Sequence, residues 1–224
     1  GSGIRKGLAK AFADAGCSVV LAGRTASRLE AAAQELGASG SQVVGIRTDA
    51  TEENQVKTLF GQTMQQFGRL DILVNASGAF DGGPIDEISL EAWNNVIGAN
   101  VTAPFLCTRE AFAIMRKAGG GRILNIGSIS AQRTRENMAP YTTSKCAVWG
   151  LTMSTALEGR DYGIAASCLH PGNVKVERRA GDTEVMMQPE EIGKMALTMV
   201  TLPPSTTVLE AVIMPITQPY IGRG

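Results

Sequence analysis

Short, continuously apolar runs alternate with helical segments along almost the whole chain, and this alternation limits the fold more than any other feature. Continuous apolar strands indicate burial on both faces, and therefore a parallel sheet between two helix layers. The pattern predicts an α/β fold with a doubly wound, mostly parallel sheet, in a single domain over residues 1–224. Strands are expected at residues 17–23, 42–48, 70–76, 122–127, 164–169 and 208–214, and helices at 25–36, 52–67, 90–117 (bent near Pro104), 141–162 and 189–201.

Charge, hydropathy and cysteine content exclude several other classes of protein. The 224 residues carry 21 Lys and Arg against 21 Asp and Glu, so no net charge attracts nucleic acid or an anionic membrane. No apolar run approaches the ~18–20 residues that span a bilayer. Four dispersed cysteines and one histidine argue against a metal site, and they favour a reducing, cytoplasmic location.

Three residues form the pattern with the clearest chemical content. Ser128 follows a predicted strand, which is where ligands bind in doubly wound sheets, and Tyr141 opens a predicted helix thirteen residues later. Lys145 is four residues after Tyr141 and therefore on the same helical face. A free phenol has a pKa near ~10, and a neighbouring ammonium would lower that pKa toward a useful acid/base range. Ser128 would then hydrogen-bond a reacting carbonyl or alcohol oxygen.

This spacing resembles the classical branch of the short-chain dehydrogenase/reductase family. Other family motifs follow in order: Asn75-Ala-Ser-Gly78 is similar to the Asn-Asn-Ala-Gly turn, and Asn100 is similar to the asparagine that completes the catalytic tetrad. Asp49-Ala50 matches the family's adenine contact, and Pro171-Gly172 matches its turn beside nicotinamide. The resemblance extends from residue 1 to about residue 215 and implies a Rossmann-type fold.

The resemblance implies a role for each tetrad residue. Tyr141 would be the general acid in reduction and the base in oxidation, and Lys145 would lower its pKa and bind the nicotinamide ribose. Ser128 would orient the substrate oxygen, and Asn100 would hold a water that leads protons to Lys145. Structural alternatives remain: Ser128 as a cap at a strand end, Asn100 as a helix-bend residue, and Tyr141 with Lys145 as an exposed helical pair.

The cofactor would be a nicotinamide dinucleotide, with NADP(H) favoured over NAD(H). The position at which NAD-dependent members carry an acid holds Gly23, and Arg24 follows it, where a guanidinium suits a 2′-phosphate. Ser2 replaces a second base found in many NADP-dependent members, and the alternative is that Arg24 pairs only with Glu30 or with solvent. The residues assigned to the cofactor are Gly3, Ile4, Arg24, Asp49, Ala50, Asn75, Ala76, Gly78, Tyr141, Lys145, Pro171, Gly172 and Val174.

The chain departs from the family pattern at its start. Only the last part of the glycine motif is present, as Gly3-Ile4, and Arg5 stands where the final glycine is expected. We expect the natural protein to have one further strand and part of a glycine turn, roughly ten residues, before Gly1. Val176 replaces a threonine that often binds the carboxamide.

These observations predict an oxidoreductase that interconverts a ketone or aldehyde and an alcohol, with 3-oxoacyl reduction as one candidate substrate class. A catalytically impaired dinucleotide-binding or scaffold protein is the alternative, and an enoyl reductase would space Tyr and Lys more widely. The resemblance also implies homodimers or tetramers that form through helices 90–117 and 141–162. Four arginines would either bind an anionic substrate or be solvated: Arg133, Arg135, Arg178 and Arg179. His170, beside Pro171, is interpreted as a structural turn residue.

Overall fold

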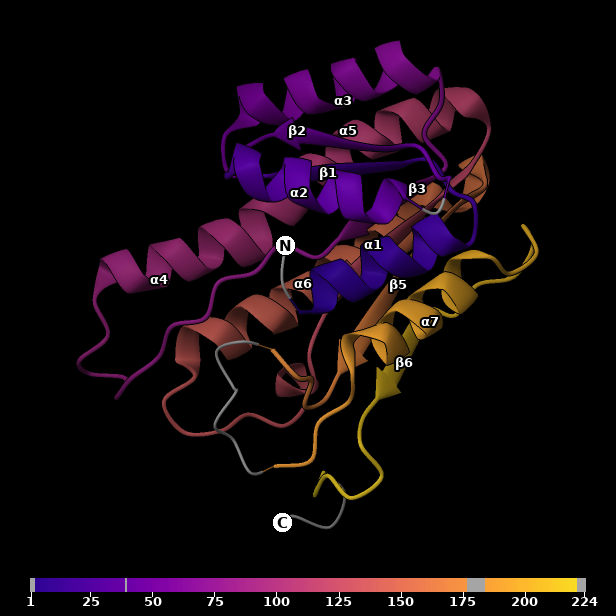
Figure 1. The fold of residues 1–224 in the computed structure, drawn as a ribbon. Coiled ribbons are helices and arrows are strands. Elements are labelled where there is room, and N and C mark those ends of the chain that lie inside the picture. Colours follow the sequence, from indigo (N-terminus) through magenta and orange to yellow (C-terminus); the bar gives the residue numbers. More distant parts are fainter. Residues whose placement is uncertain (1–2, 39, 177–183, 221–224) are drawn as a thin grey trace. The chain divides into compact units, whose positions relative to one another are not determined.

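The computed structural model describes residues 3–38, 40–176 and 184–220 (Figure 1). The chain forms two compact units. The first unit comprises Gly1–Asp49, Pro171–Leu202 and Ile213–Gly224, and the second comprises Ala50–His170 and Pro203–Val212. In the part of the chain that is described, no helix is long and apolar enough to cross a membrane.

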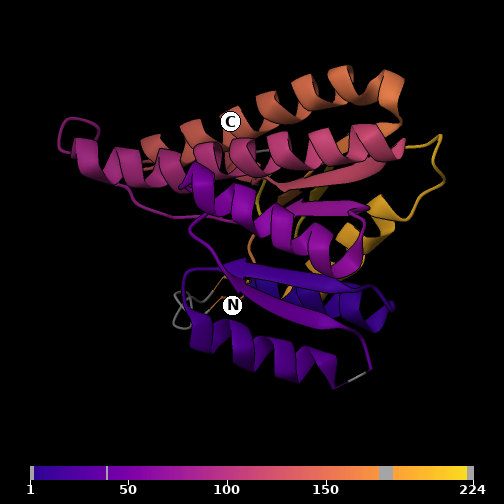
Figure 2. The same ribbon diagram turned by 90° about the horizontal axis from the view of Figure 1, so that it is seen from above.

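The first unit contains a pair of parallel strands. Strand β1 (Val19–Gly23) pairs with β2 (Val43–Arg47). Helix α2 (Ala26–Gly37) connects the two strands and packs along them (Figure 2). Its Leu36 joins Ala9 and Ala13 in a buried cluster, against which the β-branched and leucine side chains of both strands pack. This is the packing that the apolar runs predict.

Helices α1 (Ile4–Asp14) and α7 (Pro189–Val200) lie side by side in the first unit (Figure 1). A Cβ atom at Gly7 would collide with the main chain of Pro189, and one at Gly193 would collide with the main chain of Gly7. Glycine at both positions therefore lets the two helix backbones touch. Helix α1 is missing from the elements expected from the sequence, although its buried Leu8, Ala9, Phe12 and Ala13 recur at helical spacing.

The second unit is built on a four-stranded sheet. Its strand order is β3-β4-β5-β6. The strands span Ile72–Asn75, Gly121–Ile126, Ile164–Pro171 and Glu210–Ile213, and β3, β4 and β5 pair in parallel. Its helices are α3 (Glu53–Phe67), α4 (Leu90–Ile97), α5 (Ala103–Ala118) and α6 (Ala139–Gly159), with α5 and α6 packed on β4 and on each other (Figure 2). The α/β fold class is thereby confirmed.

The predicted helix over residues 90–117 is interrupted before Pro104. A π-helical segment, Gly98–Thr102, separates α4 from α5, and Pro104 lies in the first turn of α5. Proline has no N–H to donate to the carbonyl of Asn100, so the regular helical ladder cannot run through this point. The wider π turn takes its place, and it directs Asn100 into the interior, where 1% of that residue is exposed.

Candidate functional site

Lys145 and Tyr141 come from the first two turns of α6. Lys145 is 5% exposed, and its Nζ donates a hydrogen bond of 2.9 Å to the main-chain oxygen of Ile126. The same Nζ lies 5.6 Å from the centroid of the Tyr141 ring. On its other side the Tyr141 ring packs against Phe80, with the centroids 5.2 Å apart. The phenol hydroxyl has no hydrogen-bond partner among the described residues.

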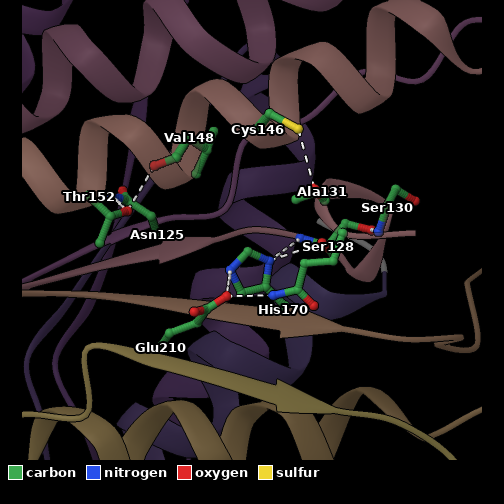
Figure 3. Close-up of polar contacts among 10 residues, drawn as sticks. Asn125, Ser128, Ser130, Ala131, Cys146, Val148, Thr152, His170 and Glu210 are labelled. Carbon is green, nitrogen blue, oxygen red and sulfur yellow. Dashed lines mark hydrogen bonds and ion pairs between the residues drawn. The ribbon is translucent and has the colours of Figure 1, made fainter. Parts of the chain in front are cut away.

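Ser128 is buried directly after β4, at the start of a short 3-10 turn, Ile129–Ala131. Its Oγ accepts a hydrogen bond of 3.1 Å from the main-chain N–H of Ser130 (Figure 3). This bond uses a lone pair of Oγ and leaves the hydroxyl hydrogen available. Ser128 does cap a turn, as the structural alternative suggested, but the cap still permits donation to a substrate oxygen.

Asn100 joins the segment after β3 to α6. Its Nδ2 donates to the oxygen of Ala79 at 3.0 Å and to Ser144 Oγ at 2.9 Å, and its Oδ1 accepts from the N–H of Ala79 at 2.7 Å. Both amide hydrogens are therefore used within the protein. Gly78 is close by, since a Cβ there would lie 3.7 Å from Asn100 Oδ1. Asn100 thus holds the turn after β3 in place, as well as marking the helix bend.

The side chain of Asn75 belongs to a buried polar chain. Its Nδ2 donates to Asn125 Oδ1 at 2.8 Å and to Thr108 Oγ1 at 3.1 Å. Asn125 in turn donates to Thr152 Oγ1 at 2.9 Å (Figure 3). Asn75 therefore uses its amide nitrogen to join β3 to β4 and α5, and this nitrogen is not available to a ligand.

Of the residues predicted to bind the cofactor, Gly3, Ile4, Arg24 and Asp49 lie in the first unit. Gly3 has φ +62°, and its main-chain oxygen accepts from the N–H groups of Lys6 and Gly7 at the start of α1, where Ile4 is the first residue. A Cβ at Gly3 would lie 2.7 Å from Val176 Cγ1, so a larger residue would clash. Arg5, at the position of the family's final glycine, is exposed to solvent.

Arg24 follows β1 and is exposed. Its main-chain oxygen accepts a hydrogen bond of 3.3 Å from Arg47 Nε. Within residues 3–38, 40–176 and 184–220, its guanidinium makes no hydrogen bond or ion pair, so the alternative pairing with Glu30 is not observed. The two predicted adenine contacts belong to different units. Asp49 is the last residue of the first segment of the first unit, and Ala50 is the first residue of the second unit.

The turn after β5 also belongs to the first unit. Pro171 ends the strand, Gly172 donates its N–H to the oxygen of Ile213 at 2.7 Å, and Val174 forms an isolated bridge with Met187. Gln218 Oε1 accepts from the N–H of Asn173 at 2.8 Å. These contacts fix the turn from within. Arg178 and Arg179, for which the sequence suggested an anionic substrate, and Ser2, which replaces a second base, lie outside the described residues.

The sequence predicts His170 as a structural turn residue, but the structure places it within strand β5, beside Ser128. It is fully buried in β5, and its Nδ1 lies 2.9 Å from the main-chain oxygen of Ser128 (Figure 3). The register that pairs Ile126 with Leu169 brings Ser128, after β4, close to His170, near the end of β5. The meeting of parallel strand ends at one edge of the sheet is the signal from which this contact could have been predicted.

Comparison with known proteins gives consistent results. A family model described as short chain dehydrogenase matches residues 1–185. The uncharacterized oxidoreductase YxjF of Bacillus subtilis is 34% identical over 214 residues, which cover 96% of this chain and 79% of that protein. The (2S)-[(R)-hydroxy(phenyl)methyl]succinyl-CoA dehydrogenase subunit BbsD of Thauera aromatica is 32% identical over 198 residues, covering 87% of this chain and 79% of that protein. A solved metagenomic short-chain oxidoreductase in complex with NADP matches with TM-score 0.85 and 27% identity, covering 95% of this chain and 92% of that one.

Proposed function

Since this chain belongs to the short-chain dehydrogenase family, we propose that it is an NADP(H)-preferring member that interconverts a ketone or aldehyde and an alcohol. The observation that carries the proposal is the buried Lys145 ammonium, held 5.6 Å from the ring of Tyr141 on α6. A buried cation beside a phenol has an evident use in proton transfer. In this proposal the chain is one dinucleotide-binding and catalytic domain, as the alternation of strands and helices predicts.

The residues of the first unit fit a nicotinamide dinucleotide that carries a 2′-phosphate. The Arg24 guanidinium is exposed and makes no bond to another described side chain, so it is available to a phosphate. Gly23 leaves no carboxylate at the position where an acid would repel that phosphate. The metagenomic relative that binds NADP supports the same choice. The bound cofactor supplies or accepts the hydride.

The remaining steps belong to residues of the second unit. In reduction, Ser128 donates its free hydroxyl hydrogen to the substrate carbonyl oxygen, and Tyr141 transfers its phenolic proton to that oxygen as it becomes an alcohol. Lys145 stabilises the resulting phenolate, because its ammonium lies beside the ring. In oxidation, Tyr141 takes the proton back. Asn100 keeps the turn after β3 and α6 in register through its bonds to Ala79 and Ser144.

Two observations support an acyl-linked, 3-oxo substrate. The relative BbsD is named as a dehydrogenase of a hydroxyacyl-CoA thioester. In the second unit, a cavity of about 300 Å³ opens at the start of α6, and its lining includes Arg135, Asn137 and Thr142. An arginine in the lining suits the anionic end of a carrier-linked or thioester substrate.

Self-association and location follow the same reasoning. Exposed apolar side chains on α5 and α6, namely Phe105, Met153 and Leu157, support a homodimer or homotetramer formed through these helices. All four cysteines are described and are free thiols, which supports a reducing compartment such as the cytoplasm.

A panel of carbonyl substrates tests the proposal. The purified protein is incubated with NADPH and with simple ketones, aldehydes and a 3-oxoacyl thioester, and loss of the nicotinamide absorbance is followed. We expect turnover of at least one ketone, faster with NADPH than with NADH. Tight nucleotide binding without any turnover would instead support the alternative, a dinucleotide-binding scaffold of the same fold.

A further inference from the structure

His170 is the only histidine in the chain, and it is enclosed in the second unit. The edge of the Trp149 ring faces it, with the centroids 6.1 Å apart and the planes at 71°. On the neighbouring strand end, a Cβ at Gly127 would lie 2.6 Å from His170 Nδ1. Glycine at position 127 therefore makes room for the imidazole, and the packing fixes the orientation of the ring.

The contacts of the ring place a hydrogen on Nδ1. This nitrogen lies 2.9 Å from the main-chain oxygen of Ser128 and 3.3 Å from its main-chain N–H (Figure 3). A carbonyl oxygen only accepts, so a bare Nδ1 would set two lone pairs against each other at the shorter distance. An Nδ1–H that donates to this oxygen removes that conflict. The Ser128 N–H could donate to Nδ1 only in the other tautomer, and the shorter contact to the oxygen favours the Nδ1–H form.

The other ring nitrogen faces Glu210. Nε2 lies 3.3 Å from Glu210 Oε1, which is ion-pair distance, but it is not aligned for a hydrogen bond with any described residue. The same carboxylate oxygen accepts a 2.5 Å bond from Gln132 Nε2. Gln132 thus supplies the carboxylate with a donor of its own.

We infer that His170 is a positioning residue for Ser128. This inference rests on the proposed function, in which the Ser128 hydroxyl orients the substrate oxygen. His170 holds the Ser128 carbonyl from one side, while the Ser130 N–H holds Oγ from the other. The two bonds fix the main chain and the hydroxyl of Ser128 together, and loss of the first would let the hydroxyl move away from its catalytic position.

A matched pair of variants separates positioning from packing. The amide nitrogen of an asparagine is two bonds from Cβ, as Nδ1 is in histidine, and leucine has a similar size without a donor. We expect His170→Leu to lower kcat by about tenfold, with the KM for NADPH unchanged, and His170→Asn to restore most of that loss. Equal losses in both variants, or no loss in either, would overturn the inference.

Two further measurements separate this inference from the proposed function. Ser128→Ala is assayed in parallel. Full activity of this variant would contradict the catalytic role of Ser128, and the positioning role of His170 with it. Loss of activity in Ser128→Ala together with wild-type activity in His170→Leu would contradict only the role of His170. Because the chain has one histidine, untagged protein with ¹⁵N-labelled histidine gives a single imidazole by NMR. We expect the hydrogen on Nδ1, and a neutral ring protonated only on Nε2 would contradict the inference even if no substrate is found.

Discussion

The Nζ of Lys145 donates a hydrogen bond of 2.9 Å to the main-chain oxygen of Ile126, two residues before Ser128. This bond joins α6 to the end of β4, which are the elements that carry Tyr141 and Ser128. One side chain, that of Lys145, therefore links the helix that contains Tyr141 to the end of the strand that precedes Ser128.

Lys145→Met should lower both the turnover rate and the affinity for NADPH, because it removes the ammonium while keeping an unbranched, apolar stem. A buried ammonium is costly to desolvate, so we expect little or no loss of thermal stability. Steady-state kinetics, nucleotide titration and a thermal melt measure the three quantities. The exposed Lys117→Met on α5 is the control, and a Lys145→Met protein with normal kinetics would contradict the assigned role.

Arg24→Asp should shift the preference from NADPH toward NADH. The carboxylate would repel a 2′-phosphate and could accept a hydrogen bond from a ribose 2′-hydroxyl. We expect the ratio of kcat/KM values for the two cofactors to change by at least about tenfold, which is ~1.4 kcal/mol. Arg28→Asp, another exposed arginine nearby on α2, controls for the change in charge. An unchanged ratio would remove Arg24 from cofactor selection.

The buried chain from Asn75 through Asn125 to Thr152 should contribute to stability rather than to chemistry. Asn125→Leu would remove the hydrogen bonds that Asn125 makes with the amide of Asn75 and with the hydroxyl of Thr152, at a cost of about 1–3 kcal/mol in the free energy of unfolding. Denaturant unfolding measures this loss, with the exposed Asn54→Leu on α3 as the control. Equal stability of the two variants would show that the chain is energetically unimportant.

The sequence predicted those parts of the fold and candidate site that depend on local spacing. Tyr141 and Lys145 share a helix, and Ser128 follows a strand whose apolar run is plain in the sequence. The contact between His170 and Glu210 was not predicted, because it depends on the order and register of β5 and β6. The π turn at Gly98–Thr102 was also missed, since residue patterns do not distinguish it from a bend at the nearby proline.

Thiol reactivity should follow burial. Burial raises the pKa of Cys107 to about 11 and that of Cys168 to about 12, with desolvation of the thiolate as the main cause. At pH 8 these groups would have thiolate fractions of roughly 10⁻³ and 10⁻⁴ respectively, so they should resist alkylation in the folded protein. Cys146 is exposed and should react faster. Peptide mass spectrometry after brief alkylation checks this order, and rapid labelling of Cys168 in folded protein would contradict it.

Tyr141→Phe tests the central claim most directly, because it removes one hydroxyl and leaves the ring against Phe80 and Lys145. The measurement is kcat for NADPH-dependent reduction of the best ketone from the panel, together with the Kd for NADPH. We predict a fall in kcat of about 10²–10⁴-fold with an unchanged Kd. A variant that retains wild-type turnover would contradict Tyr141 as the acid and base of the reaction.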